Sequence, residues 1–244
     1  MTADATLDPR ITDGMAAQRD LLEGLERDGA TLIGFKAGFG ATGALELLRI
    51  PAPLIGFLPD RTLLPASGTQ PTGIDLAGWE RPHAEAEVAV RLGRDLTPDM
   101  SDEEILAAVA SVAPAIELAD LNITPAADEV PRILAGDIFH RWLMLGDEVA
   151  VDGWAAASPR MTVTHRGADG TDTAHTVDDV EAVPGPALAV LTECVRMAPL
   201  LGRTVRAGDV VILGSIIPPL PVGPGEEYHV AFDGVAPLAV ALEG

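Results

Sequence analysis

The segment 81–90, Arg-Pro-His-Ala-Glu-Ala-Glu-Val-Ala-Val, constrains the fold of this chain most strongly. From residue 84 onward, small and acidic residues give way to valines, which predicts a β-strand. Side chains alternate between the two faces of a strand, so Glu85 and Glu87 point to the same side. Two adjacent carboxylates repel each other, so a cation must lie between them or one of them must hold a proton. A hard divalent cation with oxygen ligands is the obvious partner, although a solvated strand face would be the simpler interpretation if the pair stood alone.

A third acidic residue lies within a second predicted strand. The segment 114–120, Pro-Ala-Ile-Glu-Leu-Ala-Asp, is apolar except for its two acidic residues. Glu117 is flanked by Ile116 and Leu118, so we expect it to be buried and to need a partner. The pattern therefore predicts an acidic side chain inside the protein.

The basic residues are almost all of one type. Of the 16 lysines and arginines, 15 are arginines, and the one lysine is Lys36. The coding composition of the source explains a bias toward arginine. A lysine that survives such a bias can release a proton or fit as a compact point charge, which a guanidinium cannot. Chance survival of one lysine is the alternative. Lys36 ends an apolar run, Thr31–Lys36, that predicts a buried strand.

The glycines that follow this strand fit a dinucleotide-binding fingerprint. The sequence Gly-Phe-Gly-Ala-Thr-Gly at 38–43 matches G-x-G-x-x-G, and Asp60 follows 17 residues after the last glycine. A Rossmann domain needs further strand–helix–strand units, whereas this chain continues with prolines and a short strand, Leu54–Leu58. We therefore disfavour a nucleotide-binding site here.

Composition argues against several classes of protein. The formal net charge of −21 disfavours a nucleic-acid partner. No apolar run approaches the roughly 18 residues of a membrane span, and the N-terminus has no signal-peptide core, so we expect a cytoplasmic protein with no membrane partner. The single cysteine, Cys194, excludes an internal disulfide. It lies in an apolar helical run, where packing is a simpler role than that of a nucleophile.

The rest of the chain combines helical and strand patterns. Short alternating strands crowd the second half, with hairpin signals at Asp169-Gly170 and Asp233-Gly234. Apolar residues at helical spacing predict helices over 11–27 and 186–198, and a capping box at Ser101–Glu104 predicts a helix through Val112.

These elements predict an α+β fold with a mostly β core. The 244 residues suffice for one large domain or two small ones. We expect a short N-terminal segment, 1–65, that carries Lys36, and a metal-binding β-rich core, 66–244, which together form one compact unit.

Four motifs occur in an order that resembles a known family. They are Gly-Phe-Lys-Ala-Gly, Glu-Ala-Glu-Val-Ala-Val-x-Leu-Gly-Arg-Asp-Leu, Pro-Ala-Ile-Glu-Leu-Ala-Asp and Ala-Gly-Asp-Val-Val-Ile-Leu-Gly-Ser. Over roughly residues 30 to 244, the chain resembles the fumarylacetoacetate hydrolase superfamily, and within it the 2-keto-4-pentenoate hydratase / 4-oxalocrotonate decarboxylase branch. The resemblance implies a mixed β-roll core with peripheral helices, usually in a homo-oligomer.

The same resemblance implies a site. Lys36 matches the active-site lysine of the family, and Asp60 matches an acidic residue proposed to assist proton transfer. Ser215 matches a hydroxyl on the substrate side. The family binds Mg²⁺ or Mn²⁺ through three carboxylates, and the matching residues are Glu85, Glu87 and Glu117.

One segment departs from the pattern of the branch. Where the branch carries Asp-Asn-Ala-Ser, this chain has Gly136–Arg141. We expect Phe139, His140 and Arg141 to line the far end of the substrate. Arg141 would hold a second carboxylate or simply cover Trp142, and His140 would be an acid/base group or a packed side chain.

The chemistry of such a site suits a small 2-oxo acid. A divalent cation with open positions can be chelated by a 2-oxo carboxylate and stabilise the negative charge that develops when a proton or CO₂ leaves. Water addition and decarboxylation share this requirement. We expect a metal-dependent lyase, a hydratase of the 2-keto-4-pentenoate type or a 2-oxo-3-hexenedioate-type decarboxylase. A C–C hydrolase or tautomerase on the same scaffold and a catalytically silent partner subunit stay open, as does a complex with a pathway enzyme.

Overall fold

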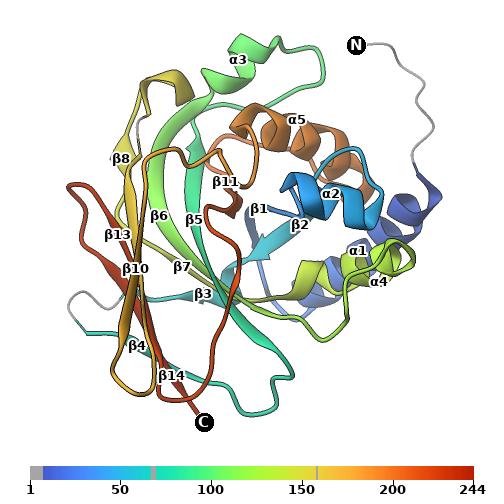
Figure 1. Cartoon of the computed structure of the whole chain (residues 1–244). Coiled ribbons are helices and arrows are strands. Elements are labelled where there is room, and N and C mark those ends of the chain that lie inside the picture. Colours follow the sequence, from blue (N-terminus) through green and yellow to red (C-terminus); the bar gives the residue numbers. More distant parts are fainter. Residues whose placement is uncertain (1–7, 67–69, 158) are drawn as a thin grey trace.

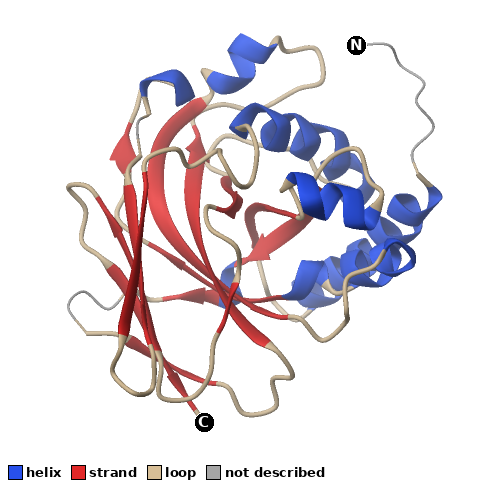
Figure 2. Ribbon diagram, in the orientation of Figure 1, coloured by secondary structure: helices blue, strands red, loops and turns tan. Residues whose placement is uncertain are grey.

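The computed structural model describes residues 8–66, 70–157 and 159–244. It contains two β-sheets of nine and five strands, and most of the helices gather on one side of the larger sheet (Figures 1 and 2). Mixed sheets with peripheral helices confirm the expected α+β fold. Among the described residues, no helix combines the length and the hydropathy that a membrane span requires.

The larger sheet carries Lys36 and the three candidate metal ligands. Its strands are β1 (Leu32–Gly38), β2 (Leu54–Pro59), β3 (Leu63–Leu64), β5 (Pro82–Leu92), β6 (Val109–Asp120), β7 (His140–Leu145), β8 (Val149–Ala150), β11 (Val210–Ser215) and β12 (Leu220–Pro221). Their order is β2-β1-β11-β5-β6-β7-β3, with β12 paired to β5 and β8 paired to β6. Strand β1 pairs in parallel with β11. Strand β1, which carries Lys36, thus shares a sheet with a strand from the C-terminal half of the chain.

The smaller sheet is built mainly from the predicted hairpins. Its strands are β4 (Thr72–Asp75), β9 (Met161–Arg166), β10 (Asp172–Val177), β13 (Glu227–Phe232) and β14 (Leu238–Glu243). Their order is β10-β9-β13-β14-β4, and both β9–β10 and β13–β14 are antiparallel. Gly170 and Gly234 in the two turns have φ values of 82° and 80°. Such left-handed conformations are expected for glycine in hairpin turns.

The five helices in the described residues are α1 (Pro9–Arg27), α2 (Thr42–Leu48), α3 (Asp102–Leu106), α4 (Val130–Ala135) and α5 (Ala187–Met197). Two of them, α1 and α5, begin and end close to the predicted ranges 11–27 and 186–198. Helix α1 starts after Asp8, whose side chain accepts a hydrogen bond from the Arg10 N–H, as an N-cap does. Cys194 in α5 is fully buried, and burial raises the pKa of its thiol, which agrees with a packing role.

Helix α3 is shorter than the sequence pattern predicts. A capping box starts it, in which the Ser101 hydroxyl accepts from the Glu104 N–H while the Glu104 side chain accepts from the Ser101 N–H. The prediction of a helix through Val112 was wrong, because α3 ends at Leu106 and β6 begins at Val109. β-Branched side chains favour strands, and both valines are buried in the sheet.

The glycine-rich segment after β1 is a packing feature. Strands β1 and β2 flank α2 and pair antiparallel, whereas the Rossmann unit requires parallel strands. A Cβ atom at Gly38 would lie 2.6 Å from Cγ2 of Ile138, and one at Gly40 would lie 2.4 Å from the carbonyl oxygen of Pro184. The two glycines therefore allow segments to approach closely, and the disfavoured nucleotide-binding interpretation does not fit this fold.

Candidate metal centre

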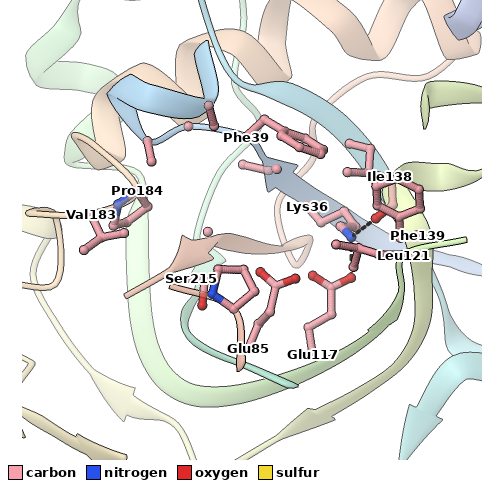
Figure 3. A pocket seen from close by; sticks show the side chains of 17 residues that line it. Lys36, Phe39, Glu85, Glu117, Leu121, Ile138, Phe139, Val183, Pro184 and Ser215 are labelled. Atoms are coloured by element: carbon pink, nitrogen blue, oxygen red, sulfur yellow. Dashed lines mark hydrogen bonds and ion pairs between the residues drawn. The ribbon is translucent and has the colours of Figure 1, made fainter. Parts of the chain in front are cut away.

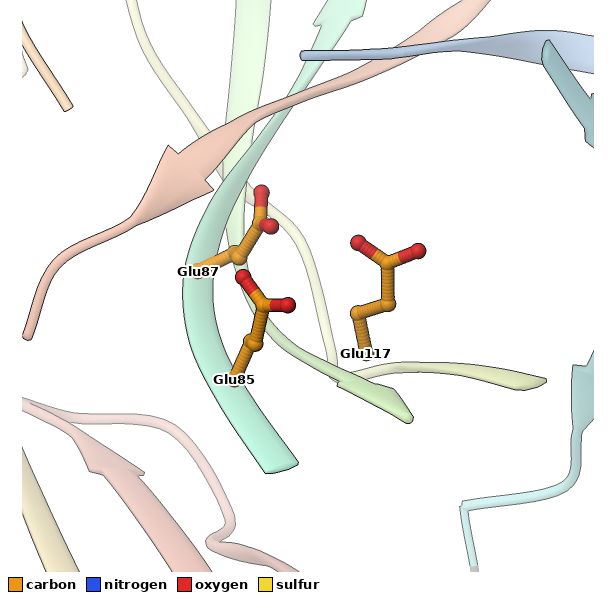
Figure 4. A group of neighbouring side chains, drawn as sticks. All are labelled: Glu85, Glu87 and Glu117. Carbon is orange, nitrogen blue, oxygen red and sulfur yellow. The ribbon is translucent and has the colours of Figure 1, made fainter. Parts of the chain in front are cut away.

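Three glutamates from two neighbouring strands form a compact cluster. Glu85 on β5 lies directly opposite Glu117 on β6, and Glu87 lies two residues further along β5. One carboxylate oxygen from each glutamate can be chosen so that all three lie within 4.8 Å of one another. Figure 4 shows the three carboxylates turned toward a common space. Glu85 and Glu87 point to the same face of β5, as predicted, and the pairing register between β5 and β6 brings Glu117 beside them.

The hydrogen bonds of this cluster occupy only some of its oxygens. Glu87 is fully buried, and its Oε2 accepts a 2.7 Å hydrogen bond from the Gly214 N–H. Its Oε1 is buried and has no hydrogen-bond partner. Buried polar atoms are rarely left without a partner, and such an exception points to a ligand or ion. An unpartnered carboxylate oxygen beside two further carboxylates fits a hard divalent cation.

Burial and mutual repulsion raise the pKa of two of these carboxylates, Glu85 and Glu87, whereas the pKa of Glu117 is lowered. Burial, together with the charge of Glu117, raises the pKa of Glu85 to about 7. The same two causes, with a further contribution from Glu85, raise the pKa of Glu87 well above its ordinary value. Burial alone would also raise the pKa of Glu117, but Lys36 and His140 outweigh it and lower that pKa. A cation bound here would relieve the repulsion.

Lys36 forms an ion pair with the third glutamate. Its Nζ donates to Oε1 of Glu117 and, at 3.0 Å, to the carbonyl oxygen of Ile138. Burial disfavours the charged lysine, but the carboxylates of Glu117 and Asp137 more than compensate, and the pKa of Lys36 is raised. The ammonium form therefore lies directly against a candidate metal ligand.

His140 holds the same glutamate oxygen from another direction. Its Nδ1 lies 2.7 Å from Oε1 of Glu117, and its Nε2 lies 2.8 Å from the Thr62 hydroxyl oxygen. Because an ionised carboxylate only accepts hydrogen bonds, Nδ1 carries a proton. Burial lowers the pKa of His140, although Glu117 opposes this. Both Lys36 and His140 bond to Oε1, so Oε2 of Glu117 is the oxygen that could bind a cation.

A buried aspartate beside the site was missed by the sequence analysis. Oδ1 of Asp137 accepts hydrogen bonds from the Phe57 N–H at 2.9 Å and from Nε2 of Gln18 at 3.3 Å. Burial raises the pKa of Asp137 well above its ordinary value. The sequence could have indicated this, because Asp137 lies between apolar residues, and an isolated acidic residue in such a segment needs a partner.

The backbone around Asp137 adopts an uncommon conformation. Asp137, Ile138 and Phe139 form a 3₁₀ turn, Asp137–Phe139, with φ values of 52°, 52° and 66°. Positive φ is rare for residues other than glycine and is genuinely unusual for bulky or β-branched ones. Such strained backbone clusters at functional sites. Here it places the Ile138 carbonyl within reach of Lys36.

A cavity of about 220 Å³ opens onto the cluster. Figure 3 shows Glu85, Glu117 and Lys36 at one part of it. The Oγ atom of Ser215 is buried without a hydrogen-bond partner. The lining residues are Lys36, Ala37, Gly38, Phe39, Gly40, Ala41, Ala44, Glu85, Glu117, Leu121, Ile138, Phe139, Val183, Pro184, Gly214, Ser215 and Pro219.

Two of the expected site residues lie elsewhere. Asp60 is exposed, and its Oδ1 accepts a 2.8 Å hydrogen bond from the Thr31 N–H. The Arg141 side chain is 47% exposed and pairs with Asp120 at 2.9 Å. Its guanidinium lies 5.8 Å from the ring centroid of Trp79, so it covers Trp79 and not the expected Trp142. Neither Asp60 nor Arg141 lines the cavity, and His140 contacts Glu117 without lining the cavity, whereas the expected Phe139 and Ser215 do line it.

The fold and the acidic cluster together define a known class of protein. A family model described as fumarylacetoacetate (FAA) hydrolase C-terminal matches residues 43–242. The chain therefore belongs to the fumarylacetoacetate hydrolase family, as the four ordered motifs indicated.

Relatives of two activities are similar to this chain. A 2-hydroxyhexa-2,4-dienoate hydratase of Comamonas testosteroni is 25% identical over 94% of this chain and 85% of the relative. A 4-oxalocrotonate decarboxylase of a Pseudomonas species is 24% identical over 100% of this chain and 92% of the relative. These relatives support a lyase of this branch.

Solved structures share the fold. The 4-oxalocrotonate decarboxylase from Pseudomonas putida G7, complexed with magnesium and adipate, superposes with a TM-score of 0.79 and 19% identity, over 95% of this chain and 86% of that one. A fumarylpyruvate hydrolase from Pseudomonas aeruginosa, in complex with Mn²⁺ and pyruvate, has a TM-score of 0.63 and 14% identity, over 86% and 88% of the two chains.

Proposed function

We propose that this chain is a divalent-metal-dependent lyase that acts on a 2-oxo acid, and that its reaction is a hydration of the 2-keto-4-pentenoate type. One observation carries the proposal above the others. The Lys36 ammonium contacts Glu117, which belongs to the three-carboxylate cluster, and both side chains line the cavity that also contains Glu85. A proton donor, a candidate cation site and room for a small acid thus meet in one place.

Glu85, Glu87 and Glu117 would hold Mg²⁺ or Mn²⁺. The unpartnered Oε1 of Glu87 and the all-oxygen donor set support this, and the solved relatives named above contain Mg²⁺ or Mn²⁺. A bound divalent cation supplies a Lewis acid for the 2-oxo group of the substrate.

Three side chains near the metal site would have separate roles in the reaction. Lys36, held in its ammonium form by Glu117, would donate a proton to the substrate and recover it in the next step. The hydroxyl of Ser215 has no partner within the protein, so it is free to hydrogen-bond to the substrate. His140 positions Glu117 by fixing its Oε1. We assign no proton-transfer role to Asp60, because it is exposed and bonded to the backbone of Thr31.

A direct assay distinguishes hydration from decarboxylation and from carbon–carbon bond hydrolysis. Purified protein would be incubated with 2-hydroxypenta-2,4-dienoate or 2-oxohex-3-enedioate, with Mg²⁺ or with EDTA, and the products would be identified by mass spectrometry. We expect Mg²⁺-dependent addition of water to the dienoate. Release of CO₂ from the enedioate with no hydration would make the protein a decarboxylase. Fumarylpyruvate would be added as a third substrate, because its 1,3-dicarbonyl unit allows cleavage of a carbon–carbon bond by water. Such cleavage would make the protein a hydrolase, and inactivity on all three substrates would support a silent subunit.

The assembly state belongs to the same proposal. The resemblance to the family implies a homo-oligomer, and multi-angle light scattering of the purified protein measures its mass against the 25.3 kDa of one chain. A mass of one chain at micromolar concentration would contradict this expectation.

A further inference from the structure

The cavity next to the acidic cluster has one polar end and otherwise apolar walls. Its polar side chains, Lys36, Glu85, Glu117 and Ser215, come from four neighbouring strands of the larger sheet, β1, β5, β6 and β11. Figure 3 shows Phe39 across the cavity from the two carboxylates, with Ile138 and Phe139 beside Lys36. The remaining walls consist of alanine, glycine, leucine, isoleucine, valine, proline and phenylalanine. A ligand whose charged head lies at the carboxylates would therefore place its tail against hydrocarbon.

Two phenylalanines form the most distinctive part of this wall. The rings of Phe39 and Phe139 meet edge to face, with centroids 6.3 Å apart and an interplanar angle of 62°. They come from separate segments, one after β1 and one before β7. Both have left-handed backbone conformations, with φ values of 61° and 66°. Such a conformation is costly for a bulky residue and persists where the surrounding structure enforces it. The fold thus accepts strain twice to place two aromatic rings at one cavity wall.

The described lining of the cavity lacks a free positive charge for a second carboxylate of the substrate. Among the described residues that line it, Lys36 is the only cation, and its ammonium already contacts Glu117 and the Ile138 carbonyl. The nearby Arg141 pairs with Asp120 and lies over Trp79, outside the cavity. A carboxylate at the far end of a substrate would face apolar walls without a counter-charge, which is unfavourable. The segment 136–141 therefore makes the tail site apolar, contrary to the expectation that Arg141 recognises a second carboxylate.

We infer that Phe39 and Phe139 form a tail-binding wall that selects 2-oxo monocarboxylates with an uncharged, apolar tail over 2-oxo dicarboxylates. This inference rests on the proposed function, because the head of the acid must bind at the acidic cluster. The small cavity suits an acid of a few carbons, since pockets for drug-sized ligands are roughly 300–1,000 Å³. The edge-to-face pair also leaves ring surface available to a flat, conjugated tail.

A three-ligand series tests the selection by binding alone. Pyruvate, 2-oxohexanoate and 2-oxoadipate share the 2-oxo acid head, and the last two differ only in a terminal methyl against a terminal carboxylate. Calorimetric titration of the Mg²⁺-loaded protein would give each affinity. We expect 2-oxohexanoate to bind at least about tenfold more tightly than pyruvate, because each buried methylene contributes roughly fourfold. We expect 2-oxoadipate to bind at least about tenfold more weakly than 2-oxohexanoate.

Variants locate the wall. Phe139→Leu and Phe39→Leu should each reduce the preference for 2-oxohexanoate over pyruvate severalfold while pyruvate affinity stays unchanged. Phe232→Leu is the matched control, because Phe232 is 8% exposed and Phe139 is 7% exposed, and Phe232 lies in β13 away from the cavity lining. Its ligand preference should equal that of the unaltered protein. Arg141→Ala should leave 2-oxoadipate binding unchanged.

The possible failures are distinguishable. Equal or tighter binding of 2-oxoadipate, or its selective loss in Arg141→Ala, would overturn the inference while leaving the head site intact. Mg²⁺-dependent pyruvate binding with no gain for 2-oxohexanoate would do the same. Absence of Mg²⁺-dependent binding for all three acids would overturn the proposed function, and the inference with it.

Discussion

Lys36 and Glu117 form a buried ion pair, in which the lysine Nζ donates to Oε1 and the side chains are 2% and 1% exposed. Removing either member of such a buried pair would leave the other charge without compensation, which is strongly destabilising. Glu117 also accepts a hydrogen bond from His140 through the same oxygen. The pair therefore connects a candidate proton donor to a candidate metal ligand through one carboxylate.

The first prediction concerns the proton carried by Lys36. An arginine keeps the positive charge but does not release its proton at working pH. The Lys36→Arg variant should lose on the order of 10²-fold or more in kcat, while calorimetry shows Mg²⁺ affinity within a few-fold of the unaltered protein.

The stem of Lys36 is tightly packed, so a second variant is needed. A Cβ atom at Gly56 would lie 2.8 Å from Cγ of Lys36, so the stem packs against the Gly56 backbone and an arginine stem would have to follow the same path. Lys36→Met has a side chain of similar volume without the charge, and it should show a comparable loss of kcat. Near-normal kcat in Lys36→Arg would show that Lys36 supplies charge alone.

The second prediction concerns Glu87. The Glu87→Gln variant should lose most of its Mg²⁺ affinity, because it removes one carboxylate of the cluster. The metal-free variant should also melt at a higher temperature than the metal-free parent, by roughly 2 to 10 °C, because a buried group that resists ionisation is replaced by a neutral one. Calorimetry and thermal melting with EDTA measure the two effects.

A buried glutamate elsewhere provides the control. Glu193 is 6% exposed and pairs with Arg196 in α5. Glu193→Gln should leave Mg²⁺ binding unchanged and should not stabilise the protein. Unchanged Mg²⁺ binding in Glu87→Gln would mean that the site is misassigned.

The third prediction concerns pH. The pKa of Glu85 is about 7 in the metal-free protein, so below this pH a cation must displace a proton. Mg²⁺ affinity should fall about tenfold between pH 8 and pH 6 through Glu85 alone. The folded-state pKa is raised, so the contribution of this carboxyl to stability is fully present below its unfolded value near 4.3 and is lost as the pH rises toward 7.

Thermal melting can check the stability part of this prediction. The metal-free protein should lose stability between about pH 5 and pH 7, and Mg²⁺ should restore it most strongly at the upper end of that range. An Mg²⁺ affinity that stays constant from pH 8 to pH 6 would contradict a proton-competing ligand at Glu85.

Much of the acidic cluster could be predicted from the sequence because strand alternation is a local rule. The spacing of Glu85 and Glu87 alone places both on one face. The apolar neighbours of Glu117 predicted its burial, and it is 1% exposed. The pairing of Glu85 with Glu117 depends on the register between β5 and β6. Register is set by turns and by burial across the whole sheet, so spacing within one strand did not reveal it.

The cavity walls were harder to predict because they depend on backbone conformation. Residues 137–139 all have positive φ and form a turn. Phe139, within this turn, lines the cavity, whereas Arg141, which follows it, does not. No local rule assigns left-handed conformations to aspartate, isoleucine and phenylalanine in succession. The sequence analysis therefore identified the segment that departs from the family branch. Of the three residues that were expected to contact the substrate, Phe139 lines the cavity, and His140 and Arg141 do not.

The last prediction compares His140, which contacts Glu117, with Asp60, which does not line the cavity. The His140→Gln variant loses an imidazole that holds Oε1 of Glu117 at 2.7 Å, so only Lys36 still fixes this oxygen and Glu117 is oriented less firmly. We expect roughly a 10- to 100-fold loss in Mg²⁺ affinity or in kcat/KM, as for other partners that orient metal ligands. Asp60→Asn retains an oxygen that can accept the Thr31 N–H and lies at an exposed position, so kcat should stay within about twofold. Steady-state kinetics over a range of Mg²⁺ concentrations would compare both variants. A loss of more than tenfold in kcat for Asp60→Asn, with His140→Gln unaffected, would return the proton-transfer role to Asp60 and would require a conformation in which its carboxylate leaves the Thr31 backbone.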